Sequence, residues 1–180
     1  MISMVILMIG SLGLLGVFGL AVQTTQASQQ DMIARQLASE AMESIYTARN
    51  TSELAWTQVQ NVSNGGIFVD NPQSVMCAGG DGILGTADDA SCLTASGAVC
   101  PNAGVKCLSE AGPDGILGTA DDVIVSLANY KRQILISTLN DASGNQIQTL
   151  HAVTITVTYT VPNSTVAKSY VLNEYVSEYH

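Results

Sequence analysis

The hydrophobic pattern of the chain begins with a long stretch that contains no charged side chain. The first charged residue is Asp31, and residues 1–22 are apolar apart from serine and glycine. As a helix, this segment is long enough to cross a hydrocarbon layer of about 30 Å. A cleaved signal peptide would have a basic start and a shorter apolar run. The pattern therefore predicts that residues 1–30 form a retained apolar helix, buried in a membrane or an equivalent apolar environment.

The helical pattern continues after this stretch as an amphipathic stripe. Between Ala34 and Ala48, apolar residues recur at spacings of three and four, which is typical of a helix with one buried face. We expect one helix of about 70 Å up to Ala48, at 1.5 Å per residue. After a break at residues 50–52, a short helix should run to about Gln60. Residues 31–60 are thus predicted to dock the helix against a head domain.

The last part of the chain, residues 123–180, has the pattern of an antiparallel sheet. Residues 153–161 alternate strictly between apolar and threonine side chains, as expected for a half-buried strand. Strands are predicted at residues 123–127, 133–139, 148–161 and 166–175, with turn sequences at residues 140–145 and 162–164. The predicted fold class is α+β: a long N-terminal helix packed on an antiparallel β-sheet meander, with a loop region stabilised by disulfides and calcium.

Four glycines recur at every third position of the apolar helix. On a helix, small residues allow neighbouring helices to approach closely, so we expect these positions to pack in the core of an assembly. The alternative is an isolated membrane anchor in which the glycines are incidental. The four positions are Gly10, Gly13, Gly16 and Gly19.

A nine-residue sequence, D-G-I-L-G-T-A-D-D, occurs twice without a single difference, at residues 81–89 and 114–122. Calcium needs six to eight oxygen ligands, and these loops combine turn-forming glycines with several carboxylates. The spacing differs from that of an EF-hand. We therefore expect two equivalent calcium sites; the alternatives are magnesium, or a pair of solvated acidic turns. The candidate ligands are Asp81, Leu84, Thr86, Asp88 and Asp89 in the first copy, and Asp114, Leu117, Thr119, Asp121 and Asp122 in the second.

Four cysteines lie in the loop-rich segment of residues 61–122. Zinc is the competing interpretation, but the chain has no C-x-x-C pair, and both histidines are distant in sequence. An even number of cysteines behind an export-like start favours disulfides. Four cysteines allow three pairings, and proximity favours Cys77 with Cys92 and Cys100 with Cys107. The first of these would contribute about 3 kcal/mol in the chain-entropy model.

Charge and composition exclude several classes of function. A net charge of −9 with only six Lys and Arg residues argues against nucleic-acid binding, which needs clustered cations. The sequence contains no Ser/His/Asp set and no phosphate-binding glycine loop, so we do not expect an enzyme. His151, beside a strand, is interpreted as a surface or sheet residue rather than a catalyst, and Trp56 as a packing residue.

The run I-S-M-V-I-L-M-I-G-S-L-G-L-L-G, followed by Q-A-S-Q-Q-D-M-I-A-R-Q-L-A-S-E-A-M-E-S-I, resembles the N-terminal helix of type IV pilins, particularly minor pilins and pseudopilins. The second acidic loop also resembles the calcium loop of the major pseudopilin of type II secretion systems. The resemblance implies a helix laid on an antiparallel sheet. The cleavable leader and the glutamate of the family are not in this sequence, so they would lie upstream of Met1 or be missing from this subunit.

These observations predict a structural subunit of an extracellular type IV pilus-like filament, built from many copies of the chain. Before assembly the subunit would be anchored in the inner membrane, and pilus assembly machinery would be a further partner. Two alternatives are a minor pilin or pseudopilin of a secretion system, and a monomeric membrane-anchored calcium-binding surface module. The role of the filament in adhesion, motility, DNA uptake or secretion stays open.

Overall fold

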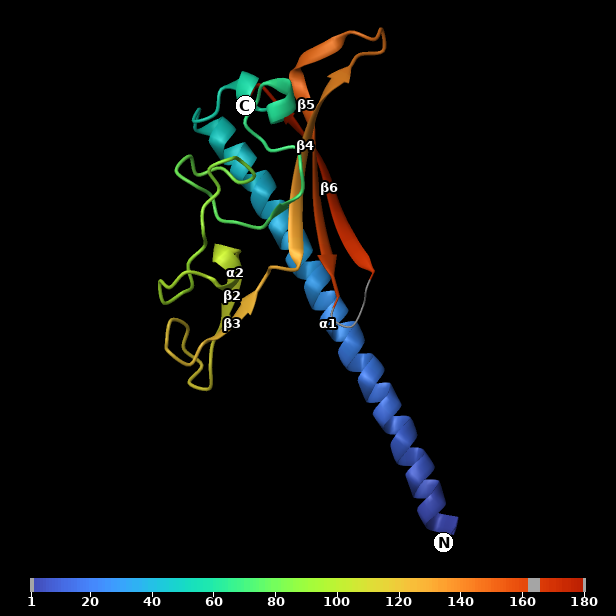
Figure 1. The fold of residues 1–180 in the computed structure, drawn as a ribbon. Coiled ribbons are helices and arrows are strands. Elements are labelled where there is room, and N and C mark those ends of the chain that lie inside the picture. The colour runs from blue at the N-terminus through green and yellow to red at the C-terminus, as the bar shows by residue number, and fades with distance from the viewer. Residues whose placement is uncertain (1, 162–165, 180) are drawn as a thin grey trace.

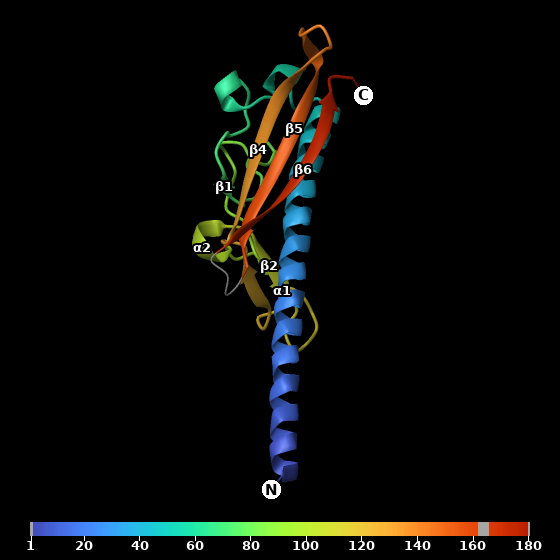
Figure 2. The ribbon, with the colours of Figure 1, turned by 90° about the vertical axis from the view of Figure 1, so that its right-hand side faces the viewer.

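The computed structural model of the protein describes residues 2–161 and 166–179, with the side chains of all of these except residues 2, 3, 5, 6 and 9. One helix, α1 (Ile2–Asn50), is unbroken over 49 residues. Its N-terminal half projects away from the head, and its C-terminal half lies along the sheet (Figures 1 and 2). The predicted long N-terminal helix is therefore confirmed. Within the residues whose side chains are described, no helix is both long enough and apolar enough to span a membrane.

The helix ends two residues after the predicted position, and the next helix is shorter than expected. Ser52 has a φ of 59°, a left-handed conformation that commonly terminates helices. The predicted short helix up to Gln60 is instead a single 3-10 turn, η1 (Trp56–Gln58), followed by a second one, η2 (Val62–Asn64). The Gln58 side chain accepts a hydrogen bond of 3.0 Å from the backbone N–H of Ala55, which favours a tight turn over a longer helix.

The main sheet has four antiparallel strands in the order β1-β4-β5-β6. Three of them form the predicted meander: β4 (Tyr130–Asn140), β5 (Gln146–Thr160) and β6 (Ala167–Ser177). The edge strand β1 (Gln73–Ser74) pairs with β4. A turn over residues 141–145 joins β4 to β5, where Asp141 accepts hydrogen bonds from the backbone of Ser143 and Asn145. The turn predicted at residues 162–164 lies outside the described residues.

One predicted strand belongs to a different sheet. Residues 123–127 were expected to lead directly into the meander, but β3 (Val123–Ser126) pairs only with β2 (Cys107–Glu110) in a separate two-stranded sheet. A four-residue helix, α2 (Pro101–Gly104), precedes β2. The expectation failed because strand propensity identifies a strand without identifying its partner, and residues 107–110 have no alternating pattern of their own.

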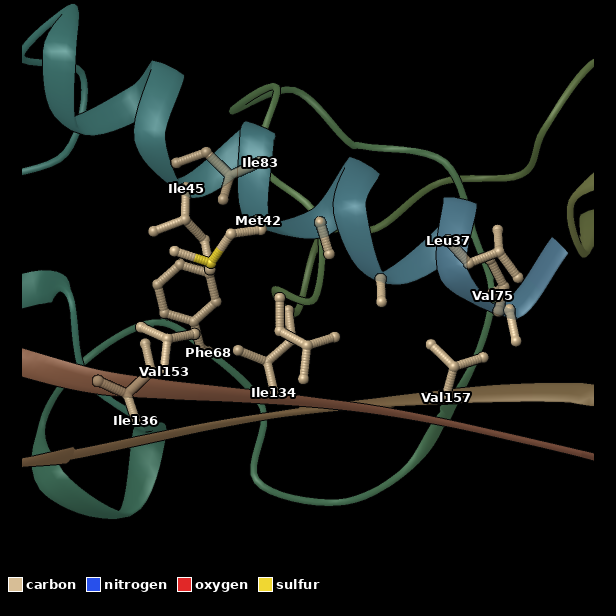
Figure 3. Close-up of a cluster of buried hydrophobic side chains, with 14 of the residues drawn as sticks. Leu37, Met42, Ile45, Phe68, Val75, Ile83, Ile134, Ile136, Val153 and Val157 are labelled. Carbon is tan, nitrogen blue, oxygen red and sulfur yellow. The ribbon is translucent and has the colours of Figure 1, made fainter. Parts of the chain in front are cut away.

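The core lies between the predicted stripe of α1 and the inner face of the sheet (Figure 3). Alanines at positions 34, 38, 41 and 48 of the helix are buried, so the helix axis approaches the sheet closely. Larger side chains fill the space between these alanines. The cluster in Figure 3 includes Leu37, Met42, Ile45, Phe68, Val75, Ile83, Ile134, Ile136, Val153 and Val157.

Polar contacts fix the helix against the edge strand β6 and its neighbour β5. The Tyr46 hydroxyl donates to the backbone oxygen of Tyr175 at 3.0 Å, and Arg49 Nη1 donates to that of Ser177 at 2.7 Å. At Asp31, the first residue after the apolar segment of residues 1–30, the carboxylate accepts a hydrogen bond of 3.3 Å from the Tyr159 hydroxyl. The direction in which the apolar half leaves the head is therefore set by several independent contacts.

Candidate functional site

The two acidic loops fold in the same way. In the first loop (residues 81–89), Asp81 Oδ1 accepts a hydrogen bond from the N–H of Ile83 at 2.8 Å. In the second loop (residues 114–122), Asp114 Oδ1 accepts one from Ile116 at 2.8 Å. The glycine after each of these aspartates has a positive φ, 68° in one loop and 69° in the other, which glycine adopts without strain. Identical sequences thus give matching turns.

A threonine hydroxyl holds the second carboxylate of each loop. Thr86 Oγ1 donates to Asp88 Oδ1 at 2.6 Å, and Thr119 Oγ1 donates to Asp121 Oδ1 at the same distance. These hydroxyls are the main reason why the pKa of Asp88 and that of Asp121 lie below the ordinary aspartate value. Both carboxylates are therefore ionised at neutral pH. A backbone amide at the start of each loop supports the same carboxylate.

The third carboxylate closes the turn. Asp89 accepts hydrogen bonds from the N–H of Gly85 at 3.0 and 3.1 Å, and Asp122 accepts one from Gly118 at 2.7 Å. In each loop, the three aspartates and the threonine predicted as ligands thus share one hydrogen-bonded turn. Among the described residues, no group of three or more His, Cys, Asp or Glu side chains is arranged to hold a metal ion.

The equivalence of the loops extends to the chain around them. Cys77 and Ala90 flank the first loop and form an antiparallel bridge. Glu110 and Val123 occupy the same positions relative to the second loop, and they form the last pair of the β2–β3 ladder. A glycine two residues before each loop, Gly79 or Gly112, lies so close to the carbonyl of Asp88 or Asp121 that a Cβ atom would overlap it. These glycines were not among the predicted site residues, although Ala-Gly stands at the same offset in both copies.

The surroundings of the two loops are different. The first loop packs against α1 and the sheet: Ile83 and Leu84 are buried, and the Ser44 hydroxyl accepts a hydrogen bond from the N–H of Leu84 at 3.0 Å. The second loop, gold in Figure 1, lies at the end of the head nearer the N-terminus. Its Ile116 and Leu117 are each 60% exposed. The same nine residues therefore form an internal turn in one place and a surface turn in the other.

A buried arginine accompanies the first loop only. Arg132 Nη2 lies 3.9 Å from Asp89 Oδ2, and the two side chains are 4% and 8% exposed. Burial raises the pKa of Asp89, while the Gly85 N–H and the Arg132 charge lower it. Burial also lowers the pKa of Arg132. No Lys or Arg among the described residues forms an ion pair with the second loop, so only the first has a cation supplied by the protein.

Arg132 was not among the predicted site residues. Its side chain lies on the inward face of β4, the same face as Tyr130, Ile134 and Ile136, which are all buried. A charged residue in register with an apolar face is a signal of a buried ion pair, because an unpaired buried charge is costly. That signal was present in the sequence and points from β4 to an acidic partner.

The disulfide pairing predicted from proximity is confirmed. Cys77 is bonded to Cys92 and Cys100 to Cys107. Cys77 also exchanges two backbone hydrogen bonds with Ala90, of 3.0 and 2.7 Å. The base of the first loop is therefore closed covalently and by hydrogen bonds, and no cysteine is free.

The four helix glycines lie in the projecting half of α1. A Cβ atom added to any of them would meet nothing within 4 Å, so the described residues of a single copy of the chain give these glycines no packing partner. The positions concerned are Gly10, Gly13, Gly16 and Gly19.

Comparison with models of known protein families, with curated proteins and with solved structures finds no match. These comparisons therefore assign the chain to no family, and the expected relation to type IV pilins stays a prediction from the residues of α1 and of the second loop.

Proposed function

We propose that the protein is a structural subunit of an extracellular type IV pilus-like filament, in which the apolar half of α1 packs with its copies in the filament core. The observation that carries this proposal is the exposure of large apolar side chains on all sides of the projecting helix. A helix that is apolar all round requires an apolar environment on every side. The exposed fractions are 64% for Leu12, 62% for Leu14, 66% for Leu15, 68% for Val17, 61% for Phe18, 66% for Leu20 and 56% for Val22.

The energy available from covering these side chains is large. Full burial of one Leu, Val or Phe is worth about 1.5–3 kcal/mol. The side chains just named would together contribute on the order of 10 kcal/mol per subunit, before the entropic cost of association. The regularly spaced glycines favour close contact between helices. Lipid offers the same environment before assembly, which supports a membrane-anchored precursor.

The head is suited to the outer wall of such a filament. Its polar contacts to Tyr46 and Arg49 fix the angle between helix and sheet, so identical copies can repeat one packing geometry. Head-to-tail contacts between identical subunits generate open helical assemblies. In this arrangement the second loop, whose Ile116 and Leu117 are exposed, is available to ligands and neighbouring subunits.

Calcium binding by the acidic loops is part of the proposal. The low pKa of Asp121 and of Asp88 supports it, because calcium binds ionised carboxylates. The second loop is the stronger candidate, since the charge of Asp89 in the first loop already faces Arg132. Isothermal titration of calcium into the wild type, Asp88→Asn and Asp121→Asn separates the loops. The heat of calcium binding should fall more in Asp121→Asn than in Asp88→Asn. If the wild type gives no heat of calcium binding, the loops do not bind calcium.

The filament proposal is tested by electron microscopy of material sheared from cells that produce the protein, with mass spectrometry of the same fraction. We expect filaments that contain this chain as their main component. A preparation without filaments, in which the protein is recovered only as a detergent-solubilised monomer, would replace the proposal by a membrane-anchored surface module. Presence at trace level in filaments made of another chain would indicate a minor pilin.

A further inference from the structure

A polar cavity of about 440 Å³ lies at the end of the head farthest from the N-terminus. Its lining residues come from the segment around η2 and from the base of the β4–β5 hairpin. This hairpin extends beyond the rest of the head (Figures 1 and 2). Its walls contain amide and hydroxyl side chains and no charged one. Besides Ile136 and His151, the lining residues are Gln60, Asn64, Ser137, Thr138, Gln146 and Gln148.

A bulge in β5 shapes this cavity. Thr138 pairs with His151, whereas the next residue of β4, Leu139, pairs with Ile147, so residues 148–150 have no partner on β4. Such bulges bend a strand and redirect its side chains, and they are common beside binding sites. The Trp56 indole N–H donates to the backbone oxygen of Gln148 at 2.7 Å, which holds the bulge in place. The side of the cavity formed by β4 and β5 is therefore fixed by strand register.

The floor of the cavity contains a buried polar atom without a hydrogen-bond partner. His151 is 2% exposed and stacks on Trp56, with ring centroids 4.4 Å apart and planes inclined by 12°. Among the described residues, its buried Nδ1 has no hydrogen-bond partner. Buried polar atoms are nearly always paired, so this nitrogen favours a ligand whose hydroxyl groups can both donate and accept.

The walls offer both donors and acceptors. Gln148 Nε2 donates to Gln146 Oε1 at 3.2 Å, and Gln146 Nε2 donates to Thr138 Oγ1 at 3.3 Å. The side chains of Gln60 and Asn64, by contrast, form no hydrogen bond within the described part of the chain. An ionic ligand would find no opposite charge here. An apolar ligand would leave the amides without partners, which is unfavourable.

We infer that this cavity binds a neutral saccharide of one or two rings. Each sugar hydroxyl can donate and accept, which matches a wall of amides and hydroxyls together with one unpaired imidazole nitrogen. The volume falls within the usual range of about 300–1,000 Å³ for small-molecule sites. The inference depends on the β5 bulge and its neighbours and does not rest on filament assembly.

Trp56 is the only tryptophan of the chain and stacks on His151, so its fluorescence reports on the floor of this cavity. The full chain would be kept in micelles of a zwitterionic detergent, because the headgroups of a sugar-based detergent would compete with the added sugar for the cavity. It would be titrated separately with D-galactose, D-mannose and N-acetyl-D-glucosamine. We expect a saturable change in Trp56 emission with at least one of the three.

Two variants localise the effect. Asn64→Ala and Thr138→Val each remove one exposed polar group from the wall, and each should weaken binding about tenfold, as expected for one hydrogen bond. Asn71→Ala, an exposed amide outside the cavity, is the matched control and should bind as the wild type does. Near-ultraviolet circular dichroism checks that all three fold. The inference is overturned if no sugar gives a saturable change, or if both wall variants respond as the control does.

Discussion

The duplicated loop allows one substitution to be compared at two sites that differ only in their surroundings. Asp89→Asn and Asp122→Asn change the same position of identical nonapeptides. In the first loop, the substitution leaves Arg132 buried without its carboxylate, with Asp89 3.9 Å away and both side chains nearly inaccessible to solvent. In the second loop, no basic partner is lost among the described residues, and the change only weakens the hydrogen bond from Gly118.

The expected magnitudes differ by several-fold. Removing one partner of a buried ion pair costs about 3–5 kcal/mol. The 3.9 Å separation places this pair at the lower end, so we expect a loss of about 3 kcal/mol for Asp89→Asn, which lowers Tm by about 6–12 °C for a chain of this size. For Asp122→Asn we expect about 1 kcal/mol or less.

The assay is thermal and urea unfolding of the full chain in detergent micelles, with excess EGTA so that calcium does not contribute. A double variant, Asp89→Leu with Arg132→Met, provides the control, because a buried ion pair can often be replaced by apolar side chains at little cost. It should be more stable than Asp89→Asn alone. Equal losses for Asp89→Asn and Asp122→Asn would refute the conclusion that the first loop is held by Arg132.

Three further predictions concern the loops and the histidine. Gly79→Ala should destabilise the protein by about 1–3 kcal/mol because the added Cβ would overlap the Asp88 carbonyl. Gly80→Ala, whose Cβ would lie 3.9 Å from the nearest atom, is the control and should have a small effect. Equal Tm values for the two variants would contradict the close approach of Gly79 to the base of the loop. Removing calcium with EGTA should lower Tm. The free energy of unfolding should fall by about 2.7 kcal/mol if the free calcium concentration was one hundred times Kd. A Tm that does not respond to the chelator would argue against a bound ion. Burial lowers the pKa of His151, so as the pH falls the unfolded chain takes up a proton near pH 6.5, before the folded protein does. Stability should therefore fall as the pH decreases from about 6.5 towards the folded pKa. His151→Phe should remove this part of the pH dependence of Tm, measured between pH 7.5 and 5.5.

The large elements of the fold could be predicted because their patterns are local. The stripe from Ala34 to Ala48 and the alternation over residues 153–161 each specify which face is buried, and both are confirmed. The partner of a strand is a non-local property, which is why β3 was assigned to the wrong sheet. The bulge at residues 148–150 was read as regular strand, since apolar and polar residues there still satisfy strand propensity.

The acidic loops show the same division between local and non-local information. The repeat correctly predicted two matching turns, because glycine and aspartate positions determine local backbone geometry. It could not reveal that only the first is buried against α1 and faces Arg132, since that depends on where the rest of the chain places each copy. His151 was expected to be a surface or sheet residue; it lies in β5 but is buried, and its unpaired Nδ1 becomes visible only once the bulge and Trp56 are in place.

The most direct test of the central claim is cross-linking of α1 between copies of the chain in isolated filaments. All four native cysteines are in disulfides, so Gly16→Cys introduces a single reactive thiol on the projecting helix. The account predicts that mild oxidation of sheared filaments yields covalent dimers that a reductant converts back to monomers. Filaments in which Gly16→Cys stays monomeric after oxidation, while its thiol remains open to a water-soluble maleimide, would contradict the packing of this helix in the filament core.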